Sequence, residues 1–535
     1  MRRVKGHVKH ACAIDDSRRR SGSEPASPPP PLLSAARDSH FRRANVVTDP
    51  GARGSFAEGS RGRSALSIDG TRTGGRYSGD MDGTGAGVED ARHFLRQFVE
   101  EFPNPPGPED LRPCGPQSSQ VTLDEVQGEA LDLVLRLLAA RKAPPLLSAS
   151  LACSAVSELL KSDLTPFRCT QDSEQDAVLL QSDLFKHLLF NKLWEVVVSW
   201  HQKPPTPDPA PTRFLRTSIH AIRNTRRKME DRHVALAEFN ELFGFTDGVQ
   251  RGYFAVFDGH GGVDAATYAA THLHVILSLQ EALKNEPAAA LKHAFSRTDE
   301  MFKLKATRER LRSGSTGVAV LLMDDWLHVA WLGDSQVMLV CQGEPVTLME
   351  PHKPEREDEK QRIENLGGCI AFMGCWRVNG TYAVSRAIGD LRVLTQTFSL
   401  LFSCPSLLGD FDQKPYISNE ADCMSVRLTG PEDYVLLACD GFFDAVQPSE
   451  VPSLVCEALS ESQGQGDLAA QRLVAQAKAA GSSDNITVML VFLRDPELLL
   501  REAEERGVLS FPGEKVDTVL DTSQCEAPAE TTPIP

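Results

Sequence analysis

Three features are missing from this sequence of 535 residues, and each absence excludes a class of protein. The twelve cysteines are scattered and form no Cys-x-x-Cys pair, which favours reduced cysteines in a cytoplasmic or nuclear protein over a disulfide framework. No apolar run reaches the roughly 18 residues that a membrane-spanning helix needs. The basic start MRRVKGHVKH has no apolar stretch after it, so it does not resemble a secretory signal.

Basic residues are also in deficit, since 57 Lys and Arg stand against 73 Asp and Glu, a formal net charge of −16. Nucleic acids are bound mainly through Lys and Arg on phosphates, so this balance argues against a nucleic-acid partner. The charge is uneven, because residues 1–80 carry 15 basic and 8 acidic residues while the remainder carries −23. No Gly-x4-Gly-Lys-Ser/Thr loop occurs, which argues against a nucleoside triphosphatase.

Composition divides the chain into four parts. Residues 1–80 are rich in Arg, Ser, Gly and Pro without apolar periodicity, so we expect a disordered basic leader, and either Met1 or Met81 fits as the start of the chain. Residues 81–205 show apolar side chains at helical spacing and are expected to form a small helical regulatory or docking region. Residues 497–535 are polar and acidic and are expected to be a disordered tail.

The remaining part, residues 206–496, alternates short β-rich runs with helical stretches. Apolar runs at 318–323, 327–332 and 337–341 follow one another without an intervening helix. This order favours an α+β fold with a central antiparallel β-sandwich flanked by helices over a doubly wound parallel sheet.

Acidic residues stand at the ends of several predicted strands. Asp258, Asp334 and Asp440 each follow an apolar run and precede Gly or Ser, and Asp484 precedes a further run. A single Asp-Gly is usually a turn, but neighbouring strands that end alike would gather their carboxylates at one rim of a sheet. Clustered carboxylates repel one another and need cations, and oxygen ligands without a Cys or His pair match Mg²⁺, Mn²⁺ or Ca²⁺ rather than Zn²⁺. Two such ions suit in-line displacement at phosphorus by an activated water.

Seven ordered segments carry a family resemblance: RRKMEDRH, YFAVFDGHGG, SGSTGVAVLL, HVAWLGDSQVML, YAVSRAIGD, LLACDGFFD and GSSDNITVMLV. Over about residues 217–495 they resemble the metal-dependent Ser/Thr protein phosphatases of type 2C. The helical N-terminal region, with SIHAIRNTRRKMEDRH and LMEPHKPEREDEKQRIENLGG, is most similar to the calcium/calmodulin-dependent protein kinase phosphatase subgroup. The resemblance implies the type 2C fold and hydrolysis of phosphoserine and phosphothreonine by metal-activated water.

The resemblance also implies a set of metal ligands for two Mn²⁺ or Mg²⁺ ions. Asp258 would bridge the two ions, and the carbonyl of Gly259 would bind one of them. Asp440 and Asp484 would hold the other ion. The remaining matched positions are Glu230, which would bind through water, Asp231 close by, and Asp334 and Asp444, which would hold a weaker third ion.

Two further residues match catalytic positions of the family. Arg226 would bind the substrate phosphate, because a planar guanidinium suits two phosphate oxygens. His260 would act as the general acid that protonates the departing Ser or Thr oxygen. The alternative for His260 is that it only stabilises the Gly-rich turn DGHGG.

One segment departs from the family pattern. About twenty residues, 391–410, stand between SRAIGD and FDQKPY, and the Gly-Asp pair is repeated at the end of the insertion. The insertion is either an added exposed loop or a feature that impairs folding or activity. It leaves open whether Asp390 or Asp410 fills the family position.

The resemblance implies phosphorylated kinases as substrates, including calmodulin-dependent and p21-activated kinases. The scattered cysteines lead us to expect a cytoplasmic location, with the nucleus as a second option. Adaptor proteins would bind through the helical region. The competing interpretation is a catalytically impaired scaffold that uses that region to recruit partners. The presence of every matched metal residue favours the enzyme.

Overall fold

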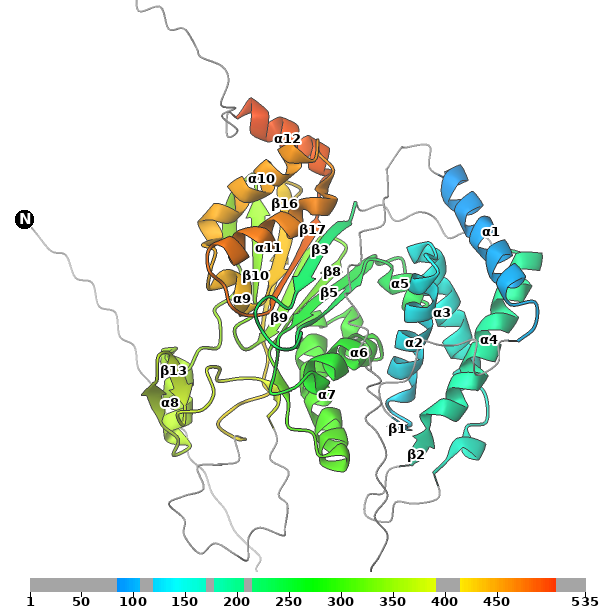
Figure 1. Ribbon diagram of the computed structural model, residues 1–535, viewed down its shortest axis with the longest axis horizontal. Coiled ribbons are helices and arrows are strands. Elements are labelled where there is room, and N and C mark those ends of the chain that lie inside the picture. The colour runs from blue at the N-terminus through cyan, green and yellow to red at the C-terminus, as the bar shows by residue number, and fades with distance from the viewer. Residues whose placement is uncertain (1–83, 106–118, 170–177, 206–213, 391–413, 507–535) are drawn as a thin grey trace, which may run out of the picture. The chain divides into compact units, whose positions relative to one another are not determined.

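The computed structural model, drawn in Figure 1, describes residues 84–105, 119–169, 178–205, 214–390 and 414–506. All of them belong to one compact unit of the chain, 68–535. The predicted leader, the insertion 391–410 and most of the predicted tail lie outside the described residues. Among the described helices, none has the length and apolar character that a membrane crossing requires.

The N-terminal part is helical, as its apolar spacing predicts. Its elements are α1 (Thr84–Glu101), β1 (Gln120–Thr122), α2 (Val126–Ala140), α3 (Pro145–Leu160), the 3₁₀ turn η1 (Thr165–Phe167), β2 (Leu179–Gln181) and α4 (Ser182–Gln202). The four helices share one buried core, to which Phe98, Leu133 and Phe185 contribute. Strand β2 occupies positions that the sequence assigns to a helix, because Leu180 pairs with Val121 of β1.

Two five-stranded antiparallel sheets form the centre of the second part, in the orders β11-β10-β16-β17-β3 and β15-β9-β8-β5-β4. The first sheet contains β3 (Arg216–Ile222), β10 (Gln336–Cys341), β11 (Glu344–Thr347), β16 (Glu432–Ala438) and β17 (Ile486–Phe492). The second contains β4 (Arg232–Leu236), β5 (Arg251–Phe257), β8 (Gly317–Met323), β9 (Trp326–Leu332) and β15 (Asp422–Arg427). Their facing side chains, such as Phe254, Val320, Leu437 and Met489, form one apolar core between the sheets.

Helices cover the outer faces of both sheets (Figure 1). The helices α6 (Asp264–Ser278) and α7 (Pro287–Glu309) pack on β5, β8 and β9, and α10 (Val451–Glu461) and α11 (Ala469–Ala479) pack on β16 and β17. Because both faces of the central strands are covered, the sequences of these strands are continuous apolar runs and do not alternate between apolar and polar residues. The predicted α+β sandwich flanked by helices is therefore confirmed.

The connections hold shorter elements. These are α5 (Phe239–Phe243), β6 (Gly259–His260), η2 (Glu281–Lys284), β7 (Gly314–Ser315), α8 (Glu357–Asn365), β12 (Ile370–Phe372), β13 (Trp376–Val378), β14 (Ile388–Gly389), α9 (Asp440–Phe443), η3 (Pro448–Glu450), η4 (Gly466–Leu468) and α12 (Pro496–Glu505). Helix α12 extends into the segment that composition assigns to the tail, because Leu499 and Ala503 of its apolar face are buried.

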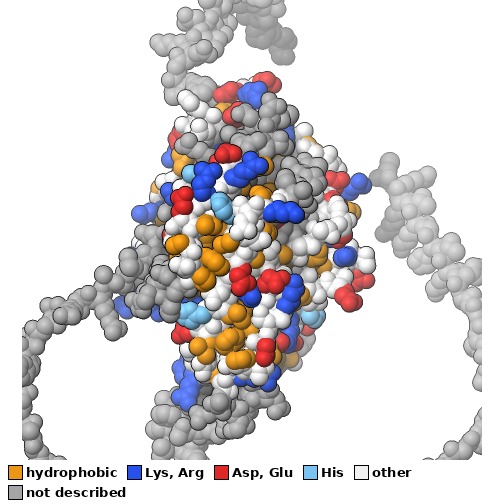
Figure 2. Space-filling model, turned by 90° about the vertical axis from the view of Figure 1, so that its right-hand side faces the viewer, with side chains coloured by type: hydrophobic (Ala, Val, Ile, Leu, Met, Phe, Trp, Pro, Cys, Tyr) orange, Lys and Arg blue, Asp and Glu red, His pale blue; other side chains and the backbone are white. Residues whose placement is uncertain are grey.

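The helical part contacts the rest of the structure through α5, α6 and α7. Glu125, at the start of α2, accepts a hydrogen bond of 3.0 Å from the hydroxyl of Tyr268 and lies 3.6 Å from the guanidinium of Arg308. Helix α2 approaches α6 closely at Gly128, where a Cβ atom would lie 2.4 Å from Nδ1 of His272. On the face in Figure 2, apolar side chains are interspersed with both acidic and basic ones.

Candidate active site

Strand order brings the predicted carboxylates to one rim of the sandwich. Strands β5 and β9 both run antiparallel to β8, so Asp258 and Asp334, which follow them, lie at the same edge of that sheet. In the other sheet β16 and β17 are antiparallel neighbours, and Ala438 pairs with Val488. The end of β16 therefore lies beside the start of β17, which places Asp440 near Asp484.

The carboxylates at this rim lie close together. Side-chain ligand atoms of Asp231, Asp258 and Cys439 lie within 4.8 Å of one another. The thiol of Cys439 is engaged with backbone atoms, since its sulfur accepts from the amide of Thr487 at 3.2 Å. Asp231 accepts a hydrogen bond of 2.7 Å from the hydroxyl of Thr487, but its Oδ1 has no hydrogen-bond partner. Oδ1 of Asp440 is likewise buried without a partner.

Burial and mutual repulsion hold these groups toward their protonated forms. Burial, followed by the charges of Asp231 and Asp440, raises the pKa of Asp258 well above its ordinary 3.8. Burial is also the main cause that raises the pKa of Asp231 and of Asp334 to about 7. The pKa of Asp440 is raised by burial and by the charges of Asp484 and Asp444.

A divalent cation fits this arrangement. Unpartnered buried oxygens and carboxylates that repel one another are what a bound cation would satisfy. The donors are oxygens, which are the ligands that Mg²⁺ and Mn²⁺ prefer. The residues that the resemblance names as ligands are therefore suited to the ions it implies.

Glycines after two of the acidic residues explain the repeated Asp-Gly pairs. A Cβ atom on Gly259 would lie 2.5 Å from the carbonyl oxygen of Glu230, and one on Gly441 would lie 2.0 Å from the carbonyl oxygen of Asn485. Each glycine thus lets a second backbone segment approach the carboxylate that precedes it. The motif is a packing requirement of the site and not only a turn signal.

Asn485 links three segments of the site and was not singled out by the sequence. Its Oδ1 accepts a 2.7 Å hydrogen bond from the amide of Glu230, and its Nδ2 donates to the carbonyls of Arg223 and Lys228. Its own amide donates to Oδ1 of Asp484 at 2.7 Å. The sequence hints at Asn485 only through its position next to Asp484 in SSDNIT, because its contacts with residues 223–230 form only in the folded chain.

His260 lies beside this cluster and pairs with Asp390. Its Nε2 is 2.8 Å from Oδ1 and 3.0 Å from Oδ2 of this buried aspartate. Burial lowers the pKa of His260, but the charge and hydrogen bond of Asp390, together with the charges of Asp334 and Glu230, outweigh burial and raise it. A Cβ atom on Gly314 would lie 2.4 Å from Nε2 of His260, so glycine leaves room for the pair. Asp390 is thus the partner of His260 in the structure, while Asp410 lies outside the described residues.

Tyr382 completes the surroundings of this histidine. Its ring meets that of His260 edge-on, with centroids 5.9 Å apart. Burial and then the neighbouring carboxylate of Asp390 raise the pKa of Tyr382 to about 12, so its hydroxyl stays protonated.

The remaining predicted residues lie at the exposed margin of the site. The guanidinium of Arg226 forms an ion pair with Asp484. Asp444 lies 3.4 Å from the ammonium of Lys353, whose pKa is raised because the charges of Asp444 and Asp334 outweigh the lowering effect of its burial. The candidate phosphate ligand thus stands directly beside a candidate metal ligand.

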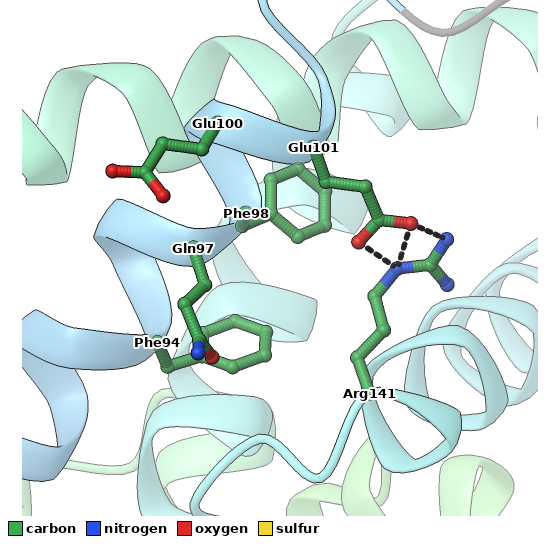
Figure 3. A pocket seen from close by; sticks show the side chains of 6 residues that line it. All are labelled: Phe94, Gln97, Phe98, Glu100, Glu101 and Arg141. Carbon is green, nitrogen blue, oxygen red and sulfur yellow. Dashed lines mark hydrogen bonds and ion pairs between the residues drawn. The ribbon is translucent and has the colours of Figure 1, made fainter.

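A separate hollow of about 280 Å³ lies at α1 and the end of α2 (Figure 3). It is lined by Phe94, Phe98 and an ion pair of 2.7 Å between Glu101 and Arg141, among others. It contains none of the candidate site residues.

Comparisons with known proteins agree with this geometry. The Protein phosphatase 2C family matches residues 215–486. Human Protein phosphatase 1F is 52% identical over 427 residues, which cover 78% of this chain and 90% of that protein. Human Protein phosphatase 1E is 46% identical over 78% of this chain but only 54% of its own length.

Among solved structures, a C. elegans sex-determining protein is similar in fold. The TM-score is 0.58 at 23% identity, and the similarity covers 78% of this chain and 96% of the other. The extent of the family match, the identity with human Protein phosphatase 1F and the acidic rim all point to the same assignment. The chain belongs to the protein phosphatase 2C family and is a metal-dependent Ser/Thr protein phosphatase.

Proposed function

We propose that this phosphatase acts on phosphorylated protein kinases, including calmodulin-dependent and p21-activated kinases. The proposal rests on the resemblance of the N-terminal region and the SIHAIRNTRRKMEDRH segment to the kinase-phosphatase subgroup. We also propose that the helical region, 81–205, binds adaptor proteins and that the enzyme works in the cytoplasm and the nucleus.

The observation that carries the catalytic assignment is the set of buried carboxylates with unpartnered oxygens at the rim of the sandwich. Asp258, Gly259, Asp440 and Asp484 would hold two Mn²⁺ or Mg²⁺ ions, with Glu230 and Asp231 in support. Bound ions would supply an activated water and would neutralise phosphoryl charge. Asp334 and Asp444 would take a weaker third ion.

Two side chains of the protein would bind the substrate phosphate and protonate the leaving group. Arg226 is exposed at the margin and would bind two oxygens of the substrate phosphate in place of its contact with Asp484. His260 would donate a proton to the departing Ser or Thr oxygen. Asp390 supports this role, because it holds the imidazole in one orientation through Nε2.

A phosphatase assay tests the assignment against the scaffold alternative. Purified full-length protein is given a phosphothreonine peptide with Mn²⁺ and then with excess chelator. We expect phosphate release with Mn²⁺ and its loss with chelator. Absence of metal-dependent release would overturn the enzymatic assignment and favour the catalytically impaired scaffold.

A comparison of kinases tests the substrate class. Phosphorylated calmodulin-dependent and p21-activated kinases are offered beside unrelated phosphoproteins of similar size. A higher kcat/KM for the kinases is expected, and equal values would refute the proposed substrate class without affecting the phosphatase assignment.

A further inference from the structure

Asp299 lies near the middle of α7, and its carboxylate is buried among residues from two other parts of the chain. Its Oδ1 accepts a hydrogen bond of 2.7 Å from the amide of Gly389, and its Oδ2 accepts one of 2.8 Å from the side-chain amide of Asn419. The ammonium of Lys414 lies 3.4 Å from both oxygens. Asp299 is only 5% exposed. The catalytic steps proposed above do not involve this buried carboxylate.

The hydrogen bond from Gly389 lies one residue before Asp390, the partner of His260. Gly389 has a φ of +84° and Asp390 a φ of +54°, so both lie in the left-handed region. A residue other than glycine adopts this conformation at a cost, and only where the surrounding structure holds it. The turn that presents the Asp390 carboxylate therefore depends on the contacts that hold its backbone.

Helix α7 supplies the strongest of these contacts that the structure shows. The amide of Asp390 donates to the carbonyl of Ser313 at 3.3 Å, whereas the bond from Gly389 to Asp299 is 2.7 Å long. Phe302, three residues after Asp299 in α7, packs on the same turn, since a Cβ atom on Gly389 would lie 3.0 Å from its ring. The turn is thus seated on one face of a long helix, which is a rigid support.

Asp390 passes this geometry on to His260. Its two carboxylate oxygens lie 2.8 and 3.0 Å from Nε2 of the imidazole. The pair is closely packed, because a Cβ atom on Gly314 would lie 2.3 Å from Oδ1 of Asp390 and 2.4 Å from Nε2 of His260. A shift of the turn would therefore move the imidazole, and a misplacement of about 1 Å can cost about 100-fold in rate.

We propose that Asp299 is a positioning residue for the proton transfer by His260. It accepts from the amide of Gly389 and so fixes the turn, and the turn fixes Asp390 and the imidazole. The inference rests on the proposed function, in which the P–O bond breaks and the departing Ser or Thr oxygen takes a proton from His260. Because Nε2 faces Asp390, the proton leaves from Nδ1, and the neutral imidazole keeps its proton on Nε2.

The test compares two leaving groups, because only one of them needs this proton. The threonine oxygen of a phosphothreonine peptide is strongly basic and departs with a proton, whereas p-nitrophenolate is weakly basic and departs without one. The kcat for each substrate is measured with Mn²⁺, and the ratio of peptide to p-nitrophenyl phosphate is compared. The proteins are wild type, His260→Ala, Asp299→Ala, Asp299→Asn and the double variant D299A/H260A.

We expect the ratio to fall at least about 100-fold in His260→Ala and about tenfold in Asp299→Ala, with little change in the KM for the peptide. Asp299→Asn should keep the ratio within about threefold of wild type, because its side-chain oxygen can still accept from the amide of Gly389. The double variant should have the ratio of His260→Ala, since both changes act on one proton transfer.

Glu300→Ala is the matched control. Glu300 is the next residue of α7, but it is exposed and lies 3.2 Å from the guanidinium of Arg297. This variant should keep the wild-type ratio. Urea unfolding checks that each variant is folded. If Asp299→Ala does not fold, Asp299→Glu replaces it: this variant keeps a carboxylate for Lys414 but displaces it from Gly389, and the same fall in the ratio is expected.

A wild-type ratio in Asp299→Ala would overturn the proposal, as would an equal fall of kcat for both substrates, which indicates a structural role only. A further fall in the double variant relative to His260→Ala, or a fall in Asp299→Asn as large as in Asp299→Ala, would also overturn it. Failure of the functions beneath it looks different: wild type would then hydrolyse neither substrate, or His260→Ala would keep the wild-type ratio, and the proposal would fall with them.

Discussion

Buried and half-buried carboxylates occur in two contrasting settings in this protein. In helix α8, Glu359 accepts hydrogen bonds of 2.8 Å from both Arg362 and Arg386. Asp422 accepts from His352 at 3.0 Å and from Arg386 at 3.0 Å. The hydrogen bond from His352 lowers the pKa of Asp422, and the arginine hydrogen bonds outweigh burial and lower the pKa of Glu359.

At the rim of the sandwich the buried carboxylates of Asp258 and Asp440 have other carboxylates as their charged neighbours, whereas Asp484 and Asp444 at its margin pair with Arg226 and Lys353. The pKa of Asp258 and of Asp440 is raised by burial and by these charges. This difference indicates which carboxylates support the fold and which are available to bind a metal ion. A carboxylate paired with cations of the chain itself stabilises the fold, whereas one without them is suited to a cation that the chain does not contain.

The largest effect is expected from Asp258→Asn and Asp440→Asn. Mutation of a residue that only orients a metal ligand lowers metal affinity or activity about 10–100-fold. Removal of a ligand's own charge should therefore reduce kcat/KM by at least about 100-fold. The same changes relieve repulsion and should stabilise the metal-free protein by about 1 kcal/mol. Phosphopeptide kinetics with Mn²⁺ and urea unfolding in chelator measure the two effects. Wild-type kinetics in either variant would show that the ligand set is wrong.

Glu359→Ala should have the opposite effects: it should destabilise the fold and leave metal binding unchanged. It leaves the half-buried guanidinium groups of Arg362 and Arg386 without their common partner, which should cost about 3 kcal/mol of unfolding free energy. Urea unfolding checks this loss, and Mn²⁺ binding by the folded variant should match that of wild type. A variant as stable as wild type would remove the distinction between the two settings.

Arg226→Ala tests the margin of the site. Loss of the guanidinium should raise the KM for phosphopeptide about tenfold or more with a smaller change in kcat, because a charge-assisted contact with phosphate is removed. Steady-state kinetics measure both constants, and Arg226→Lys serves as the control that keeps the charge. A fall in kcat at unchanged KM would contradict the proposed role.

The two settings should also differ in pH dependence. Asp334 and Asp231 have a pKa of about 7 in the folded metal-free protein against an ordinary 3.8, so the folded state binds protons more tightly than the unfolded state. Their contribution to the free energy of unfolding therefore falls as pH rises from about 4 to about 7. The lowered pKa of Asp422 has the opposite effect: its contribution is present above 3.8 and is lost as pH falls further.

Urea unfolding in chelator between pH 5 and 8 tests this sign. Subtraction of the Asp334→Asn curve from the wild-type curve isolates the contribution of Asp334 to the free energy of unfolding, which should decline as pH rises. A difference that is flat or rises with pH would contradict the raised pKa.

The smallest effect is expected from deletion of 391–410. The described flanks of this segment both contact Asp299, which accepts from the amide of Gly389 at 2.7 Å and lies 3.4 Å from the ammonium of Lys414. Asp390, the partner of His260, remains after the deletion. Phosphopeptide kcat/KM should stay within about twofold of wild type, and loss of activity would refute the view that the segment is dispensable.

The sequence alone predicts the sandwich and four of its eight metal-site candidates, Asp258, Asp334, Asp440 and Asp484, because strands covered on both faces leave long apolar runs with an acidic residue next to them. It does not predict β3 and β4, which lie at sheet edges and carry polar, partly exposed residues. The role of Asn485 depends on contacts more than 250 positions away in the chain. The pairing of Asp390 with His260 likewise depends on tertiary structure, since the same Gly-Asp pair occurs at 409–410.

Calorimetric titration of Mn²⁺ into metal-free protein tests the central distinction most directly. Wild type and Glu359→Ala should each bind two ions per chain with comparable affinity, and Asp258→Asn should lose at least one of them. No binding by wild type, or the same binding by wild type and Asp258→Asn, would contradict the proposal that the buried carboxylates at the rim form the metal centre.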